Sequence, residues 1–423
     1  MDGPAAYLQA LDHTRTRTVM TLRLMARVLL FGAALAGPIG CRSDTSTDTV
    51  VTDSAGVRTI SVSWDAAPIL PLDTTHVLAI GGGDEFKDTD FHKIRGIAFL
   101  GDSTLFIVDG GAQQIVRIDM ITRSTARIGQ RGDGPFEFRG LTSLIPAGGG
   151  NLYAVDAQRR RIVEVSASGD LVAEHAFPPE ARTPGHLYVA LAGPATIEGV
   201  YVGVVPAFSG LPDGHAHRAY GALARFTDPS DTLTGFLGAS EFMSVRAAGA
   251  VMFGASTLMS GSESGVWIGD TATPMVERWA PPAGLMTRVV WTTRRTRELT
   301  PQRLQRFWST VESNLPSGDV SSLAEMKQTL PFADSIPAFG SLVTGPREIW
   351  IADQYPPEAR YFEEPIRAQE WLVVDWETGD SYRVVTPPGF SLRLVTPRHL
   401  VGVHRDALGA ETVRLYPAPA VGG

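Results

Sequence analysis

The chain has 423 residues, of which 43% are hydrophobic and 19% charged, so it can bury a core and is not disordered by composition. Its net charge is −8, and because the first 40 residues carry four Arg against two Asp, the remainder is more acidic still, which excludes nucleic acid as the main partner. The single cysteine, Cys41, excludes an intrachain disulfide and any cysteine-based metal site.

The chain begins with a segment that we predict to be an export leader. Arg23 and Arg27 form its positively charged start, and the apolar stretch 28–36 that follows is too short to span a bilayer comfortably. Small residues then lead to Cys41. This pattern resembles a bacterial lipoprotein signal, in which the cysteine is lipidated and becomes the new N-terminus, although Pro38 stands where such signals usually have an aliphatic residue. A plain secretory signal or an uncleaved anchor is the alternative.

The leader is therefore assigned to residues 1–40, and Cys41 is the candidate lipidation site. Residues 41–56 are rich in Ser, Thr and Asp and lack apolar periodicity, which predicts a flexible tether before a domain that spans 57–419. We expect an exported protein that is lipid-anchored to the cell envelope, in the periplasm or at the outer membrane. The anchor would be its contact with the membrane, and the domain is expected to be a monomer.

The segments 94–119 and 138–166 repeat one another. Five positions of the first recur 47 residues later in the second, pairing Leu105, Val108, Asp109, Ile115 and Val116 with Leu152, Val155, Asp156, Ile162 and Val163. A period near this length, with several short β-rich runs in each unit, is typical of propeller blades. Turns rich in Gly, Asp and Ser divide the first unit into four predicted strands, at 95–99, 105–109, 114–119 and 125–129.

The first unit ends in the linker IGQRGDGPFEF, 128–138, whose glycines permit positive φ and whose proline fixes the chain as it passes to the next unit. An earlier version of this linker at 80–91 implies that 76–80 is the outermost strand of a blade whose other strands lie elsewhere. The C-terminal segment 391–417 supplies only three strands. The two segments are therefore predicted to pair and close the ring, which removes two exposed sheet edges.

The middle of the chain supplies three more divergent blades, at about 186–238, 245–291 and 338–386, each with an aromatic residue in its second strand. The strand 57–63 alternates apolar and polar residues and is expected to add to the closing blade. The predicted fold is therefore all-β, a six-bladed β-propeller with an N-terminal strand closing the last blade and a short helical insertion.

The insertion, residues 294–337, breaks the β pattern. One helical face collects five apolar residues, Leu304, Phe307, Trp308, Val311 and Leu315. Thr300 is a suitable N-cap before Pro301, and a second helix is expected to begin at Ser322, with Glu325 completing a capping box. A connector packed against the side of the propeller and a lid or partner-docking helix over one face are both compatible with this pattern.

From the leader to the end, the chain resembles a bacterial six-bladed β-propeller lipoprotein of the NHL-repeat-like type. The resemblance spans nearly all of residues 53–417, and it implies a fold and export but no activity. The segments that carry it are DSAGVRTI at 53–60, GDGPFEF at 132–138, REIWIAD at 347–353 and RDALGAETVRLY at 405–416.

Related six-bladed enzymes, such as gluconolactonase-like and paraoxonase-like hydrolases and an amidating lyase, hold a metal in the central channel. Such a site needs several Asp, Glu, Asn or His side chains that converge from the innermost strands. The innermost strands predicted in this chain contain none of these residues, and they read RGIAF, RGLTSL, LYVALAG, ASTLMSG, GSLVTG and SLRLVT. We therefore predict neither a metal site nor a cofactor, with Ca²⁺ or Zn²⁺ entering only under an enzymatic alternative. No GxSxG elbow, P-loop or zincin helix is present in the sequence either.

The same strands offer Arg95, Arg139 and Arg393 as candidate ligand-binding residues, and the first two hold matching blade positions at the start of an innermost strand. They are either a basic mouth for an anionic ligand or partners of neighbouring acids and carbonyl groups.

Three aspartates, Asp109, Asp156 and Asp353, each end a second strand and are expected to cap turns by accepting hydrogen bonds from backbone N–H groups. His399 and His404 flank a strand of the last blade and are expected to be structural.

These features favour a binding or scaffold propeller at the cell envelope, which recognises a protein, peptide or glycan through its loops or channel mouth and shows no sign of catalysis. The alternative is a metal-dependent hydrolase or lyase of the lactonase-like type. That alternative would require three or more Asp, Glu, Asn or His side chains at one end of the channel.

Overall fold

The computed structural model describes residues 49–82, 86, 89–179, 187–193, 196–204, 216–237, 242–245, 247–293, 295–314, 320–354 and 367–419. The predicted leader, 1–40, and the predicted lipidation site Cys41 lie outside the described residues. Among the helices that are described, none is both long and apolar enough to cross a membrane.

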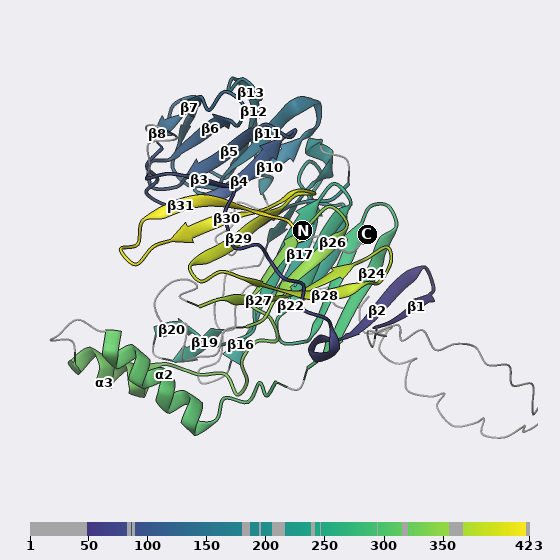
Figure 1. Cartoon of the computed structure of the whole chain (residues 1–423), viewed down its shortest axis with the longest axis vertical. Coiled ribbons are helices and arrows are strands. Elements are labelled where there is room, and N and C mark those ends of the chain that lie inside the picture. Colours follow the sequence, from purple (N-terminus) through teal and green to yellow (C-terminus); the bar gives the residue numbers. More distant parts are fainter. Residues whose placement is uncertain are drawn as a thin grey trace, which may run out of the picture. The chain divides into compact units, whose positions relative to one another are not determined.

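The described chain is mostly β, and its strands form six blades of four antiparallel strands (Figure 1). Blades one and two contain β4 (Ile94–Leu100), β5 (Thr104–Asp109), β6 (Gln114–Asp119) and β7 (Thr125–Ile128), then β10 (Leu141–Ala147), β11 (Asn151–Asp156), β12 (Arg161–Ser166) and β13 (Leu171–Ala176). Blades three and four contain β14 (Leu187–Leu191), β15 (Val200–Val204), β17 (Tyr220–Arg225) and β18 (Thr232–Leu237), then β21 (Thr257–Ser262), β22 (Gly265–Asp270), β23 (Met275–Ala280) and β24 (Gly284–Thr292). Blades five and six contain β25 (Ser341–Thr344), β26 (Glu348–Ala352), β27 (Gln369–Asp375) and β28 (Ser381–Thr386), then β29 (Phe390–Val395), β30 (His399–Arg405), β31 (Glu411–Pro417) and β3 (Leu78–Ile80). Each strand series runs from the innermost to the outermost strand of its blade.

The six blades close into a ring. Among the innermost strands, β4 contacts β10 and β29, while β25 contacts β21 and β29, and β21 contacts β14. Blades two and three are joined through a shared apolar cluster that contains Ile145 and Leu191. The structure therefore confirms the prediction of an all-β, six-bladed propeller, and it also confirms all six innermost strands.

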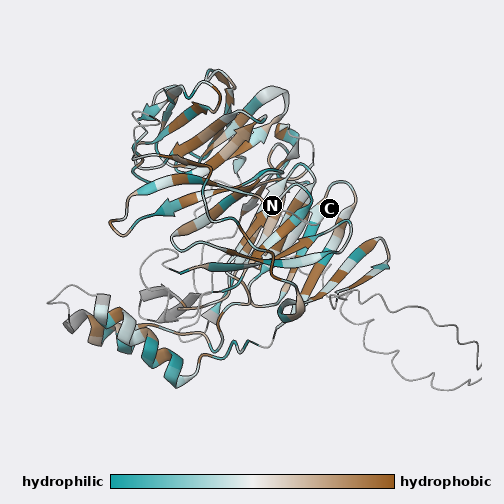
Figure 2. Ribbon diagram, viewed as in Figure 1, coloured by the Kyte–Doolittle hydropathy of each residue, from teal (hydrophilic) through white to brown (hydrophobic). Residues whose placement is uncertain are grey.

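The core lies between the blades. One cluster joins Ile80 and Val413 of blade six to Ile97 and Leu105 of blade one, and equivalent clusters lie between the other blades. Because the second strand of each blade is covered on both faces, its central residues are buried and apolar in sequence, as at 105–108 of β5 and 152–155 of β11, and the strict alternation of a one-sided sheet is lost there. These continuous hydrophobic stretches are visible along the strands in Figure 2.

The predicted closure of the ring is confirmed. Strand β3 pairs antiparallel with β31, with Leu78 opposite Leu415 and Ile80 opposite Val413. Strand β3, which precedes blade one in the sequence, thus completes blade six, and its residue Ile80 is fully buried.

The N-terminal strand 57–63 does not join the closing blade, so that expectation was wrong. It forms β2 (Val57–Ser63), which pairs in parallel with β24 of blade four, and β1 (Thr49–Ser54) pairs with its other edge. Ile60 and Val62 are buried in the same cluster as Trp291 of β24, which explains why β2 pairs with the outer edge of blade four. Alternation identifies a strand but not the sheet edge that it joins. Strand β1 also lies within the tether predicted over 41–56, and the part of that tether before residue 49 lies outside the described residues.

The predicted helical insertion is confirmed as α2 (Pro301–Asn314) and α3 (Val320–Thr329), and α3 begins two residues before the predicted start. Thr300 caps α2, since its hydroxyl accepts a hydrogen bond from the backbone N–H of Arg303. The helices bury their own apolar cluster, made of Phe307, Val311 and Leu323 with Met252, Phe253, Leu304, Trp308 and Phe332 around it. In Figure 1 they lie beside a small sheet of β16 (Ala216–His217), β19 (Phe242–Val245) and β20 (Ala247–Ala250).

Candidate functional site

The central channel holds an open cavity of about 840 Å³. All six innermost strands line it, each with its carboxyl-terminal half, and the turns that follow four of these strands complete the rim. Because the innermost strands stand at the ends of their sheets, their channel-side backbone groups are not used in sheet pairing within the described blades. The cavity can therefore offer both side chains and backbone groups to a ligand.

The wall of the cavity is built from small and aliphatic residues with a few hydroxyl groups. Two of these hydroxyls join blade four to blade five: the Thr344 hydroxyl and the Ser260 hydroxyl lie 2.8 Å apart, and the backbone N–H of Thr344 donates to Ser260 Oγ at 2.9 Å. These bonds fix the wall where two blades meet. The remaining hydroxyls on the lining are those of Ser143, Ser262 and Thr396.

Charged side chains surround the rim. Asp102 and Glu263 come from the turns after β4 and β21. Arg393 lies in β29, Arg398 in the turn after it, and His399 begins β30. Arg393 lies at a β-bulge, since the register between β29 and β30 shifts between Leu392 and Leu394, and a bulge re-aims the side chain of the extra residue. Burial lowers the pKa of His399, and the neighbouring Arg398 lowers it further. The rim thus combines two carboxylates with two guanidinium groups.

The three candidate arginines do not form one site. Arg393 lines the cavity, whereas Arg95 and Arg139 lie at the amino-terminal ends of their innermost strands and are not part of its lining. Arg139 forms an ion pair with Asp133, as the structural alternative for these residues anticipated. Arg95 is exposed and occupies a bulge of β4, in the same manner as Arg393 on β29.

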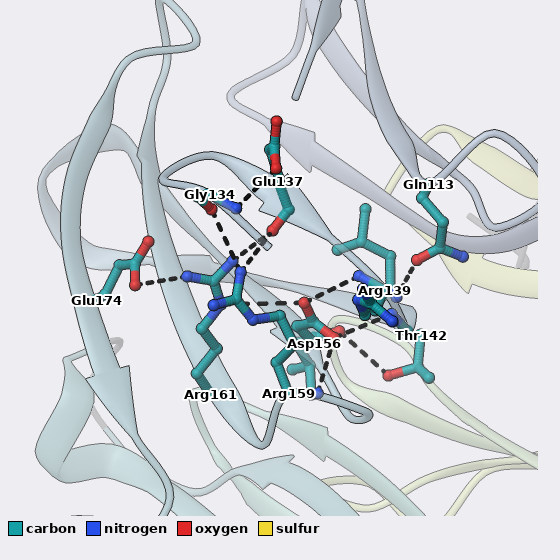
Figure 3. A network of polar contacts seen from close by, with 12 residues as sticks. Gln113, Gly134, Glu137, Arg139, Thr142, Asp156, Arg159, Arg161 and Glu174 are labelled. Carbon is teal, nitrogen blue, oxygen red and sulfur yellow. Dashed lines mark hydrogen bonds and ion pairs between the residues drawn. The ribbon is translucent and has the colours of Figure 1, made fainter. Parts of the chain in front are cut away.

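Two of the three candidate aspartates cap turns as predicted. Asp109 and Asp156 are fully buried. The first accepts hydrogen bonds from the backbone N–H groups of Gly111 and Ala112, both at 3.0 Å. Asp156 accepts from Gly140 at 2.9 Å, from Arg159 at 3.1 Å and from Arg139 at 3.2 Å, and the Arg161 guanidinium lies 3.9 Å away (Figure 3). Asp109 also accepts from the backbone N–H of His92 at 3.3 Å, so each aspartate joins the entry of an innermost strand to the end of the second strand.

Asp353, at the third such position, has a different environment. It forms an ion pair with Arg295, whose other amino group donates to Glu370 at 2.8 Å, and Glu370 also accepts from the Trp64 indole at 2.8 Å. Burial raises the pKa of Asp353 to about 6, with nearby Glu370 adding to the rise and Arg295 opposing it. The acid is therefore held where its charge is partly disfavoured.

We expect this pKa to appear as a pH dependence of stability. In the folded chain Asp353 keeps its proton up to about pH 6, whereas in the unfolded chain it releases the proton near its ordinary value of 3.8, so the stabilisation present below that value is lost as the pH rises through about 6. Asp353→Asn cannot titrate. Its free energy of unfolding, measured by urea titration at several pH values, should therefore rise relative to that of the unmodified chain between about pH 4 and pH 6. A difference that stays constant from about pH 4 to pH 7 would contradict the assignment.

Asp102, Glu263 and Arg398 of the rim were not identified from the sequence, and His399, which also lines the cavity, was identified but expected to be structural. The first three lie in turns that follow innermost strands, and a search confined to strands could not include them. Asp102 and Glu263 are each followed by Ser, a pattern that is common in turns. They come to the same rim only because the blades close into a ring. Among the described residues, no three His, Cys, Asp or Glu side chains are grouped so that they could hold a metal ion.

Comparison with known proteins finds similar solved structures at low sequence identity. No protein-family model and no curated protein matches the sequence. A member of the DUF4221 family from Bacteroides vulgatus is 10% identical, with a TM-score of 0.47 over 81% of this chain and 99% of that one. Virginiamycin B lyase from Staphylococcus aureus is 9% identical, with a TM-score of 0.37 over 81% of this chain and 98% of that one. The calcium-binding protein regucalcin from Agrobacterium tumefaciens is 10% identical, with a TM-score of 0.38 over 83% and 97%.

Proposed function

We propose that the protein is an exported, lipid-anchored binding protein of the cell envelope that holds a peptide in its central channel. The observation that supports this proposal most is the open cavity of about 840 Å³, which all six blades line. Its volume falls within the range of sites that bind small molecules and short peptides. The site is built on rigid strands that are braced between neighbouring blades, so it is formed before a ligand arrives.

The charges on the rim favour a peptide over a neutral ligand. Arg393 and Arg398 suit a carboxylate, which a guanidinium binds through two parallel hydrogen bonds, and Asp102 and Glu263 suit an ammonium group. A short peptide presents both kinds of group. The channel-side backbone of the innermost strands can add hydrogen bonds to its main chain, as in other modes of peptide recognition that use a strand edge.

Export and anchoring are supported by the sequence, through the leader at 1–40 and through Cys41. Incorporation of labelled palmitate that disappears in Cys41→Ser would support the anchor. A chain that is exported but takes up no label would replace the lipid anchor with a plain secretory signal.

The channel can be tested by titration calorimetry of the full chain in detergent with trialanine. Trialanine with a blocked amino or carboxyl end should bind more weakly, because it lacks one of the two charges. The double variant Arg393→Gln, Arg398→Gln should lose affinity by roughly tenfold or more, since two charge-assisted contacts are removed. A matched control removes two exposed charges from the helical insertion, Arg306→Gln with Lys327→Gln, and should bind like the unmodified chain.

Three outcomes would overturn this proposal. If Arg393→Gln, Arg398→Gln and the control variant bound trialanine equally well, the two arginines of the rim would not be part of the binding site. Binding of neutral oligosaccharides in preference to peptides would make the ligand a glycan. Stoichiometric Ca²⁺ or Zn²⁺, found by mass spectrometry in protein purified without chelator, would favour the metal-dependent hydrolase or lyase instead.

A further inference from the structure

A second charged surface lies at the end of the ring opposite to the cavity. It is formed by blades one and two, and we call it the basic face. Its cations are the exposed Lys93, Arg95, Arg131 and Arg139, joined by the half-buried Arg159 and Arg160. These residues belong to the entries of β4 and β10, to the linker between the two blades, and to the turn between β11 and β12. None of them lines the channel cavity.

Backbone contacts hold these segments together. The turn after β5 is tied to the entry of β4, since the backbone N–H of Gly110 donates to the carbonyl of Lys93 at 2.7 Å. Arg95 lies directly over Gly110, where any side chain would collide with it. Arg131 donates to the carbonyl of Gly111 at 2.7 Å, which brings the linker to the same turn.

The second half of the basic face is organised by the linker itself. Strands β8 (Gln130–Arg131) and β9 (Glu137–Phe138) pair in parallel and fold the linker back on itself. The Arg159 guanidinium donates to the carbonyls of Gly134 and Glu137, at 3.2 and 3.4 Å (Figure 3). Arg131 and Arg159 are thus positioned by carbonyl groups, which orient a guanidinium without neutralising its charge.

The positive charges outnumber the negative ones. Asp133 pairs with Arg139, Glu137 is bound by Gln130 and by the backbone N–H of Gly134, and the exposed Asp90 lies two residues before His92. The nearby Arg161 is excluded from the count because Asp156 and Glu174 flank it at 3.9 and 2.5 Å. With the buried Asp109 counted as well, six cations face four carboxylates among the described residues of this surface, in a chain whose net charge is −8. A positive surface on an acidic protein attracts anions over a distance and steers their approach.

The surroundings of these cations narrow the class of partner. Among the described residues, none of the exposed large hydrophobic side chains belongs to the segments 92–95, 110–113, 131–139 or 158–160. A protein partner is normally held by buried aromatic or aliphatic anchors, and a membrane surface by inserted apolar side chains. A chain of sugars that carries repeated carboxylates needs only spaced cations with several donors each, and arginine meets this need.

From this placement, we propose that the basic face binds an acidic polysaccharide, whose repeated carboxylates bridge Lys93 and Arg95 to Arg131 and Arg159. This binding is separate from the peptide proposed for the channel. It would hold the propeller against a polyanionic layer of the envelope while the opposite end of the ring stays open to its ligand.

The test uses the full chain with Cys41→Ser, so that a lipid anchor contributes nothing, and polygalacturonate immobilised on a biosensor surface. The chain with an unmodified basic face should bind polygalacturonate. Its affinity should fall steeply as the salt concentration is raised, because salt ions then compete for the ion contacts. The variant Lys93→Gln, Arg95→Gln should bind polygalacturonate roughly tenfold more weakly. Both side chains are exposed, and neither makes a hydrogen bond to another residue in the described part of the chain. The matched control is again Arg306→Gln with Lys327→Gln, which changes the net charge equally and should bind like the unmodified face.

If the Lys93→Gln, Arg95→Gln variant and the control variant lost the same affinity for polygalacturonate, net charge alone would determine binding. If both bound as tightly as the unmodified chain, the basic face would not take part in the interaction. Either result overturns the proposal. Vesicles of phosphatidylcholine with phosphatidylglycerol provide the third comparison, and binding to them without binding to polygalacturonate would make the partner a lipid surface. Trialanine affinity, measured on the same variants, reports on the channel independently, so the two proposals can fail separately.

Discussion

Asp156→Ala is expected to lower the free energy of unfolding by about 3–5 kcal/mol, one of the largest effects of any single substitution in this chain. The carboxylate is fully buried and accepts hydrogen bonds from three backbone N–H groups, those of Arg139, Gly140 and Arg159. Alanine leaves these donors without an acceptor. It also leaves the nearly buried Arg161 with Glu174 as its one remaining carboxylate partner among the described residues.

Urea unfolding followed by tryptophan fluorescence measures this loss. Asp119 provides a matched control, because it also caps a turn, accepting from Ile121 at 2.9 Å and Thr122 at 2.8 Å, but it is accessible to water. Asp119→Ala should cost much less, since water replaces the lost acceptor. Comparable losses in the two variants would show that the turn itself matters and that burial does not.

Ile80→Ala is expected to cost about 2–5 kcal/mol, because it removes a fully buried side chain from the strand that closes the ring. Ile80 belongs to the cluster between blades six and one, together with Leu105, Val116 and Val413. Loss of these contacts weakens both the closing strand and the joint between the last and first blades. The loss should therefore appear as cooperative unfolding of the whole ring at lower urea concentration.

Val77→Ala is the control for this prediction, since Val77 precedes the same strand and its side chain is 57% exposed. It should change stability by no more than about 0.5 kcal/mol. If Ile80→Ala produced a separate early transition that left most of the signal unchanged, the closing strand would be a local addition to the fold and the ring would not depend on it.

Much of the fold could be predicted from the repeat. Leu105 to Val116 and Leu152 to Val163 recur at a constant spacing, and a unit of four short strands cannot bury both faces unless it stacks with others like it. The closing strand followed from a simple count, because the C-terminal segment supplied three strands and the segment before the first unit supplied the fourth. Strand 57–63 was placed in the wrong blade because its pattern carries no information about its partner.

The candidate site was predictable only in part. Arg393 was identified and does line the channel, but Arg95 and Arg139 were grouped with it because all three belong to innermost strands. An innermost strand has two ends, and these lie at opposite ends of the ring. Asp353 was grouped with Asp109 and Asp156 by its position after a second strand. Its different behaviour comes from Arg295, which lies 58 residues away along the chain.

The sequence by itself determined the class of fold, the number of blades, the closure of the ring and the helical insertion, because these depend on local strand patterns that repeat along the chain. Only the tertiary structure determined which side chains meet. The rim draws Asp102, Glu263 and Arg398 from three different blades, and the basic face draws its cations from two blades and the linker between them. The physical reason is that a ring of stacked sheets brings together the ends of strands that are distant in sequence, and no local pattern records that proximity.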